Sequence, residues 1–228
     1  MFSGISWSQL STVIAAVGAL GTAAFGLVDA FKALPGGGIS RAGFKFINDS
    51  IKTLAPDVDS LKGTGLSLDK LLFTLRSQWI NGATATSDQV NIAKSLIKLR
   101  LTPETAPALA MATGVDAATL ATIAAKIKSG TALTQPESDV FGRFDVLLST
   151  MLDQAYQRAS QRYRNVAKAT AVPVAVALAV TASLSMPGHI STPGAVLLGL
   201  IATPIAPVAK DITSALATAS QTIQSWKR

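Results

Sequence analysis

The chain has 228 residues, of which 49% are hydrophobic and only 14% are charged. A typical soluble domain carries roughly 25% charged residues, so this composition argues against an ordinary soluble globular protein and favours a membrane protein. The absence of cysteine excludes disulfides, thiolate metal sites and a thiol nucleophile, and the single histidine, His189, cannot form a histidine-based metal site alone. The net charge of +7 points to an anionic partner, either a membrane surface or a nucleic acid.

The first uncharged stretch runs from Met1 to Val28. Within it, Leu10 to Val28 consists mostly of apolar and small residues, and a helix needs about 20 residues to cross the hydrocarbon core of a bilayer. No Lys or Arg precedes this segment and the basic residues follow it, which is the wrong polarity for a secretory signal. The sequence therefore predicts a first membrane span that acts as an anchor.

A second uncharged stretch runs from Ala169 to Ala209, with only His189 as a titratable group. Its length suits two helices, and Pro187-Gly188 breaks it into a second span near residues 169–186 and a third near residues 193–209. A re-entrant hairpin is an alternative, because the third segment is short and contains Pro204 and Pro207. A buried helical hairpin of a soluble protein is a further alternative, disfavoured because soluble cores rarely hold so long a run without charge.

All Lys and Arg residues lie in Lys32–Lys168 or in Lys210–Arg228. Because cytoplasmic segments carry the excess of basic residues, we expect the N-terminus outside the cell, the middle region in the cytoplasm and the C-terminus in the cytoplasm. This topology predicts a multi-pass protein of the cell inner membrane.

Small residues recur every four positions along the first span, at Gly18, Thr22 and Gly26. This spacing lets two helix backbones approach closely, so the three residues are predicted to form a helix-packing face, within the chain or between subunits. The alternative is the ordinary richness of membrane helices in alanine and glycine.

The region between the spans shows helical periodicity, for example at Ile47, Ile51 and Leu54, and no sustained alternation typical of strands. Thr134-Gln135-Pro136-Glu137 opens the longest predicted helix, which continues into the second span. The predicted fold is all-α: an integral membrane protein with about three transmembrane helices and a helical cytoplasmic domain. The segments are a first transmembrane helix at 1–34, a helical cytoplasmic domain at 35–136, a juxtamembrane helix at 137–168, a transmembrane hairpin at 169–209 and an amphipathic C-terminal helix at 210–228.

A basic cluster leads directly into the second span; it consists of Arg158, Arg162, Arg164 and Lys168. These residues are predicted to bind lipid headgroups, each contributing about 1 kcal/mol near an anionic surface. Tyr156 and Tyr163 are expected in the headgroup belt of aromatic residues. Nucleic acid is the disfavoured alternative, because no recognised binding motif accompanies the cluster.

The stretch that contains Phe144-Asp145, Met151-Leu152-Asp153 and Tyr163-Arg164 resembles a feature of uncharacterised bacterial multi-pass integral membrane proteins. The resemblance covers about 40 residues before the second span, and it implies an early span, a helical cytoplasmic part and a basic helix that enters the next span. It implies no activity.

The sequence contains no phosphate-binding loop of the Walker type and no nucleophile elbow, and its carboxylates lack visible catalytic partners. No cofactor, catalytic residue or metal site is predicted. The predicted function is that of a non-enzymatic membrane scaffold or accessory subunit, with membrane lipids and a second copy or another membrane protein as partners. The alternative is an oligomeric pore lined by small and hydroxyl residues, since no span carries a charge at mid-depth.

Overall fold

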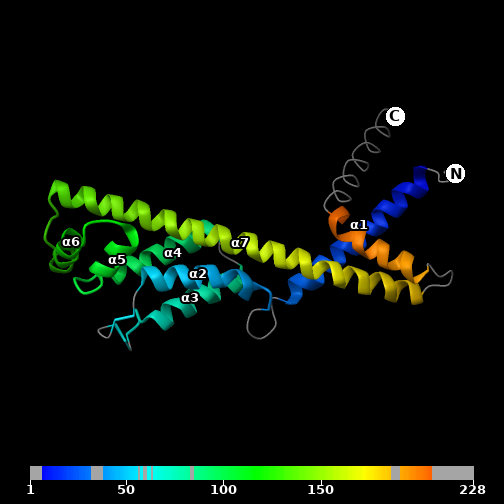
Figure 1. Ribbon diagram of the computed structural model, residues 1–228, viewed down its shortest axis with the longest axis horizontal. Helices are drawn as coiled ribbons and strands as arrows, with labels where there is room; N and C mark the ends of the chain where they lie inside the picture. Colours follow the sequence, from blue (N-terminus) through cyan, green and yellow to red (C-terminus); the bar gives the residue numbers. More distant parts are fainter. Residues whose placement is uncertain are drawn as a thin grey trace, which may run out of the picture. The chain divides into compact units, whose positions relative to one another are not determined.

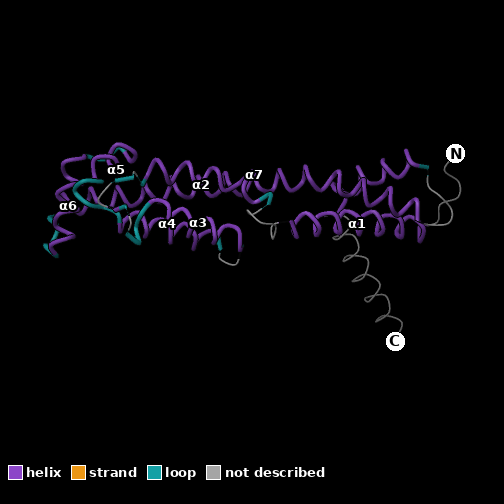
Figure 2. The backbone as a smooth tube through the Cα atoms, turned by 90° about the horizontal axis from the view of Figure 1, so that it is seen from below, coloured by secondary structure: helices purple, strands orange, loops and turns teal. Residues whose placement is uncertain are grey.

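The computed structural model describes residues 7–31, 38–55, 57–58, 61–62, 64–82, 85–185 and 191–206. Every regular element in this part of the chain is a helix, and the connecting segments are loops and turns (Figure 2). The all-α prediction is therefore confirmed for these residues. The predicted turn around His189 and the predicted C-terminal amphipathic helix lie outside the described residues.

The described part of the chain contains seven labelled helices, and an eighth helix comes after them (Figure 1). They are α1 (Trp7–Ala30), α2 (Ser40–Leu54), α3 (Leu68–Asn81), α4 (Thr86–Leu99), α5 (Ala106–Thr113), α6 (Ala117–Ser129), α7 (Gln135–Ser185) and the helix Thr192–Ala206. The predicted uninterrupted helix is confirmed, because α7 remains helical through Pro173.

The chain divides into two compact units. The first unit contains α1, the part of α7 from Arg164 onward and the helix Thr192–Ala206. The second unit runs from Ile39 to Tyr163 and contains α2 to α6 and the first part of α7. Each unit has its own set of buried residues, so each is described by itself.

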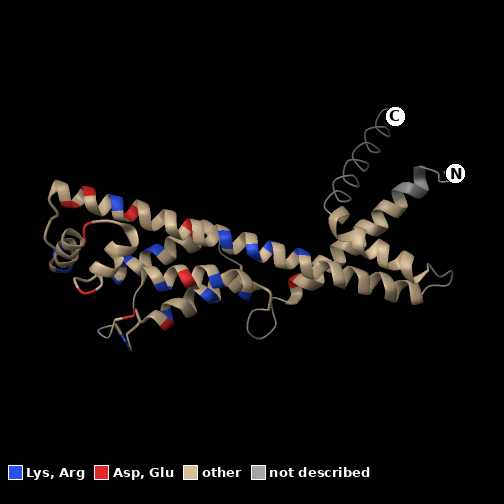
Figure 3. Cartoon of the chain, viewed as in Figure 1, with Lys and Arg blue, Asp and Glu red and all other residues tan. Residues whose placement is uncertain are grey.

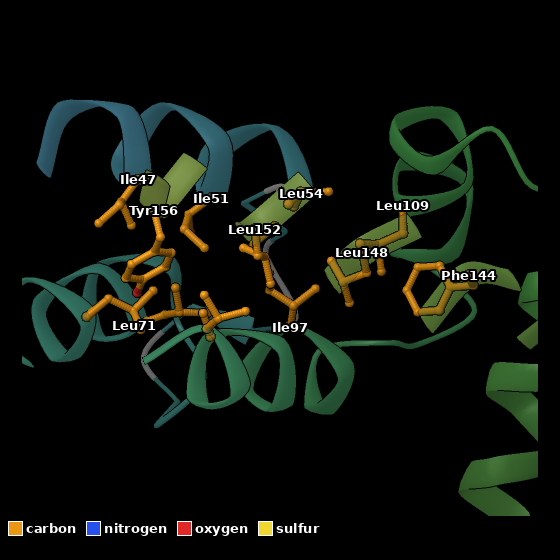
Figure 4. Packing of buried hydrophobic residues seen from close by; sticks show 14 of the residues in the cluster. Ile47, Ile51, Leu54, Leu71, Ile97, Leu109, Phe144, Leu148, Leu152 and Tyr156 are labelled. Atoms are coloured by element: carbon orange, nitrogen blue, oxygen red, sulfur yellow. The ribbon is translucent and has the colours of Figure 1, made fainter. Parts of the chain in front are cut away.

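The core of the second unit forms where α2 and α4 pack with α7. The periodic apolar face of α2 is fully buried, with Ile47, Ile51 and Leu54 all at 0% exposure. Leu148 and Leu152 of α7 belong to the same buried cluster, and Figure 4 shows these side chains directed toward one another. The spacing of three and four residues on α2 thus predicts its buried face correctly.

Glycine allows α2 and α7 to approach closely. A Cβ atom added to Gly43 would lie 2.7 Å from the carbonyl oxygen of Ala159 and 2.7 Å from Cζ2 of Trp79. Trp79 is held in place because its Nε1 donates a 2.9 Å hydrogen bond to the carbonyl oxygen of Ser40. Its ring also meets Tyr156 edge-on, with ring centroids 6.3 Å apart. The contact fixes α2, α3 and α7 against one another.

Helix ends in the second unit follow familiar capping chemistry. Gly82, Gly114 and Gly130 end their helices in the left-handed conformation that favours glycine. Asp116 caps α6 by accepting a 2.7 Å hydrogen bond from the backbone N–H of Thr119. Thr102 opens a turn in which its carbonyl oxygen accepts from the backbone N–H of Thr105, and α5 begins at Ala106.

The expectation that Tyr156 lies in a headgroup belt is wrong. Its side chain is 0% exposed and belongs to the core of the second unit. Tyr156 is four residues beyond Leu152 on α7, so it continues the buried face of that helix. Burial in apolar surroundings raises the pKa of its hydroxyl above the ordinary value.

Candidate functional site

The first unit is the candidate site, because its helices meet through small residues. On α1 the buried positions are Gly18, Gly21, Ala24 and Val28. Of the three residues predicted to form a packing face, only Gly18 lies in this buried row. Thr22 and Gly26 are exposed, on a face of α1 that the described residues do not cover.

Thr22 and Gly26 therefore stay predicted residues of a contact with another molecule. The hydroxyl of Thr22 donates a 2.9 Å hydrogen bond to the carbonyl oxygen of Gly18, so it is satisfied within α1. A Cβ atom added to Gly26 would meet nothing within 4 Å. The face keeps a shallow surface that another helix could approach closely.

Two glycines mark the closest helix contacts inside the first unit. A Cβ atom added to Gly21 would clash with the backbone carbonyl of Ala202 on the last described helix. A Cβ atom added to Gly199 of that same helix would lie 2.5 Å from Cα of Val176 on α7. The helix Thr192–Ala206 therefore touches α1 at Ala202 and α7 at Gly199, and a glycine lies at each contact.

A row of small residues on α7 completes this packing. Ala171, Ala175, Ala179 and Ser183 are all buried and are spaced four residues apart. Sequence reasoning identified a small-residue row only on the first span and missed this one. The spacing of four was available as a signal, but alanine is so common in this chain that the row does not stand out.

Several large apolar side chains of the first unit are exposed, although Val28 is buried and Leu20 and Leu178 pack partly buried against its small residues. These exposed residues are Val13, Leu27, Phe31, Leu184, Leu197, Leu200 and Ile201. The buried cluster, by contrast, is built on Ala24, Ala175 and Ala202. A water-soluble core has the opposite distribution, with large apolar residues inside. The surface that this unit presents is apolar.

Charged residues are almost absent from the helices of the first unit (Figure 3). Among the described residues, α1 (over Thr12–Ala30) and α7 are long and apolar enough to cross a membrane. The helix Thr192–Ala206 is apolar but shorter. By length and composition, two helices of the described chain are thus candidate membrane spans.

The four basic residues of the predicted headgroup site, Arg158, Arg162, Arg164 and Lys168, are all exposed on α7. At 3.6 residues per turn, the four positions fall within an arc of roughly 160° around the helix axis. The positive charges therefore lie along one broad side of α7. None of the four forms an ion pair with the described part of the chain.

Three carboxylates of the second unit, those of Asp49, Glu137 and Asp145, form ion pairs with lysines. Asp145 lies 2.9 Å from Nζ of Lys98 and 3.4 Å from Nζ of Lys94. Burial alone would raise the pKa of Asp145, but the two lysines outweigh burial and the pKa is lowered. Asp145 therefore stays ionised and is poorly suited to act as a general acid. The residues that the structure describes contain no group of three potential metal ligands.

No protein-family model, curated protein or solved structure matches the chain. The resemblance to bacterial multi-pass membrane proteins stays a prediction.

Proposed function

We propose that the protein is an integral membrane scaffold or accessory subunit that binds a second copy of itself or another membrane protein. The observation that carries this proposal is the distribution of side chains in the first unit, with small residues such as Ala175 and Ala202 inside and large apolar residues such as Leu184 and Leu197 outside. Membrane helices pack in this way, because lipid solvates large apolar side chains and small residues let backbones approach.

In the proposed topology, α1, the second half of α7 and the helix Thr192–Ala206 are three spans. The N-terminus lies outside, and the second unit and the C-terminus lie in the cytoplasm of a bacterial cell. The described helix Thr192–Ala206 rises roughly 22 Å, which is less than the hydrocarbon core of about 30 Å. Residues 207–209, which the predicted third span also contains, lie outside the described residues.

The exposed face of α1 supports a scaffolding role. Gly26 and Thr22 leave a surface that a neighbouring helix could approach, whereas the opposite face of α1 is occupied within the chain. The exposed cations of α7 support contact with the anionic headgroups of the cytoplasmic leaflet. The lysine-paired carboxylates, for example Asp145, favour a non-enzymatic role.

The mass of the full-length chain in lipid nanodiscs tests this proposal. We expect a defined oligomer, or a stable complex with a membrane protein that copurifies. A strictly monomeric chain that carries no protein partner through purification would rule the scaffold out.

A pore formed by several copies is a second candidate, favoured by the hydroxyl groups on exposed faces of the spans. Thr22, Thr181 and Ser185 each donate to a carbonyl of their own helix, at 2.8 to 2.9 Å, which leaves the oxygen lone pairs available to a polar path. Planar-bilayer recordings test the pore. Conductance under voltage or tension would support the pore. Absence of conductance in bilayers in which incorporation of the protein has been confirmed would exclude it.

A further inference from the structure

A groove lies between α2 and α7 in the second unit, with a volume of about 270 Å³. Its lining includes Phe46, Asp49 and Ser50 of α2, and Met151, Gln154 and Arg158 of α7. All six belong to one compact unit, so the groove is built by a single folded core.

The groove presents one uncompensated positive charge. The carboxylate of Asp49 already contacts Nζ of Lys45 at 2.6 Å, and it also accepts a hydrogen bond from Asn48. The pairing with Lys45 lowers the pKa of Asp49, so this carboxyl group stays ionised and neutralised by its neighbour. Arg158 lines the same groove without forming an ion pair within the described part of the chain.

Hydrogen-bond donors and apolar surface accompany this charge. The hydroxyl of Ser50 and the amide of Gln154 line the groove and bond to no other described residue. Phe46 and Met151 supply apolar surface beside them. A guanidinium with two neutral donors suits a phosphate group, and the adjoining apolar side chains suit a ligand that carries a hydrocarbon part.

We propose that this groove binds the phosphodiester of an anionic membrane phospholipid, with Arg158 pairing with the phosphate and Ser50 and Gln154 donating to its oxygens. Phe46 and Met151 then contact the start of the acyl region. The proposal rests on the membrane location proposed above. It assigns Arg158 a specific ligand, whereas Arg162, Arg164 and Lys168 act on headgroups only through their charge.

The test uses the full-length chain in a non-ionic amphipol and a short-chain phosphatidylglycerol below its micelle concentration, with binding followed by calorimetry. We expect saturable binding that Arg158→Gln weakens about tenfold or more, because a hydrogen bond to a charged group is lost. Arg143→Gln is the matched control, since Arg143 is exposed on α7 and does not line the groove. The deacylated headgroup, glycerophosphoglycerol, should bind more weakly than the lipid.

Asp49→Asn provides a gain of binding that misfolding cannot mimic, because removal of the carboxylate strengthens the positive field at the groove. Phe46→Ala should weaken binding of the lipid while leaving the weaker binding of glycerophosphoglycerol unchanged. Equal affinity of the wild type, Arg158→Gln and Asp49→Asn would overturn the proposal, and so would equal binding of lipid and deacylated headgroup. The scaffold proposal is tested separately by the mass of the particle. A monomer that binds lipid through Arg158 would support the lipid site and contradict the scaffold. An oligomer without such binding would support the scaffold and contradict the lipid site.

Discussion

The Nζ atom of Lys126, near the end of α6, lies 2.7 Å from Oε1 of Glu137 in the first turn of α7. Lys126 also donates a 2.7 Å hydrogen bond to Oε2 of Glu137, and this oxygen accepts further hydrogen bonds from the backbone N–H and the hydroxyl of Thr134. This is the Thr-x-x-Glu capping pattern at the start of α7, reinforced by a lysine from the preceding helix. The hydrogen bond from Lys126 and those from Thr134 lower the pKa of Glu137 to about 2.

The first prediction concerns the pH dependence of this capping contact. Because the pKa of Glu137 is lower in the folded chain than its ordinary value of 4.5, the ionised carboxylate stabilises the fold above that value. The stabilisation is lost as the pH falls toward about 2. Glu137→Gln should therefore lower Tm at pH 7, and the difference from the wild type should vanish near pH 2. A Tm difference that persists unchanged at low pH would show that ionisation of Glu137 is not its source.

The second prediction compares two glycines in helices of the second unit. Gly43→Ala should destabilise the fold by about 1–3 kcal/mol, because the added methyl group meets the carbonyl of Ala159 and the ring of Trp79. Gly142→Ala should instead stabilise it by about 0.5–1 kcal/mol, because Gly142 is exposed in the interior of α7 and its Cβ would meet nothing. Denaturant titration measures both changes. Equal effects of the two substitutions would contradict the close approach of α2 and α7.

The third prediction concerns the hydroxyl of Tyr156, which is buried without a hydrogen-bond partner in the described part of the chain. Burying an unsatisfied hydroxyl costs about 1–3 kcal/mol, so Tyr156→Phe should raise the free energy of unfolding by about 1 kcal/mol. Tyr156→Ala should lower it by about 3–5 kcal/mol, because it leaves a cavity in the core. A loss of stability in Tyr156→Phe would mean that the hydroxyl has a partner.

Sequence patterns predicted the helices well where local chemistry decides them. Thr134 and Glu137 mark the start of α7, and the spacing of Ile47, Ile51 and Leu54 predicts the buried face of α2. These features depend on residues within one or two turns of one another. They are therefore visible in the sequence without knowledge of the tertiary contacts.

Contacts between distant segments were not predictable in the same way. Tyr156 was assigned to a lipid interface because it precedes a basic cluster, whereas its burial depends on α2 and α3, more than seventy residues earlier. The burial of Arg100, whose guanidinium donates to the carbonyl oxygen of Leu66, likewise depends on a segment that sequence periodicity does not connect to it. The contact of Gly21 with Ala202 needs the register of two helices, which the spacing within either helix does not contain.

The fourth prediction separates the two faces of α1 with the same substitution. Gly26→Leu should reduce the oligomer mass in nanodiscs without changing the thermal stability of the chain, because its side chain meets nothing within the described structure. Gly21→Leu should lower thermal stability, because it forces α1 away from the backbone of Ala202. Thermal scans and mass measurements on both variants make the comparison. If the oligomer mass of Gly26→Leu equals that of the wild type, Gly26 and Thr22 do not form the subunit contact.

The last prediction tests the proposed topology and exploits the absence of cysteine from the chain, since any single cysteine can be labelled without background. Ser191 is exposed just before the last described helix, where the three-span topology puts the outside of the cell. Thr150 is exposed on α7 in the second unit, which the same topology puts in the cytoplasm. In intact cells, a membrane-impermeant maleimide should label Ser191→Cys and should label Thr150→Cys only after lysis. Absence of Ser191→Cys labelling both before and after lysis would indicate a re-entrant hairpin, whose turn stays inside the membrane. Labelling of Thr150→Cys in intact cells would reverse the orientation of the second unit.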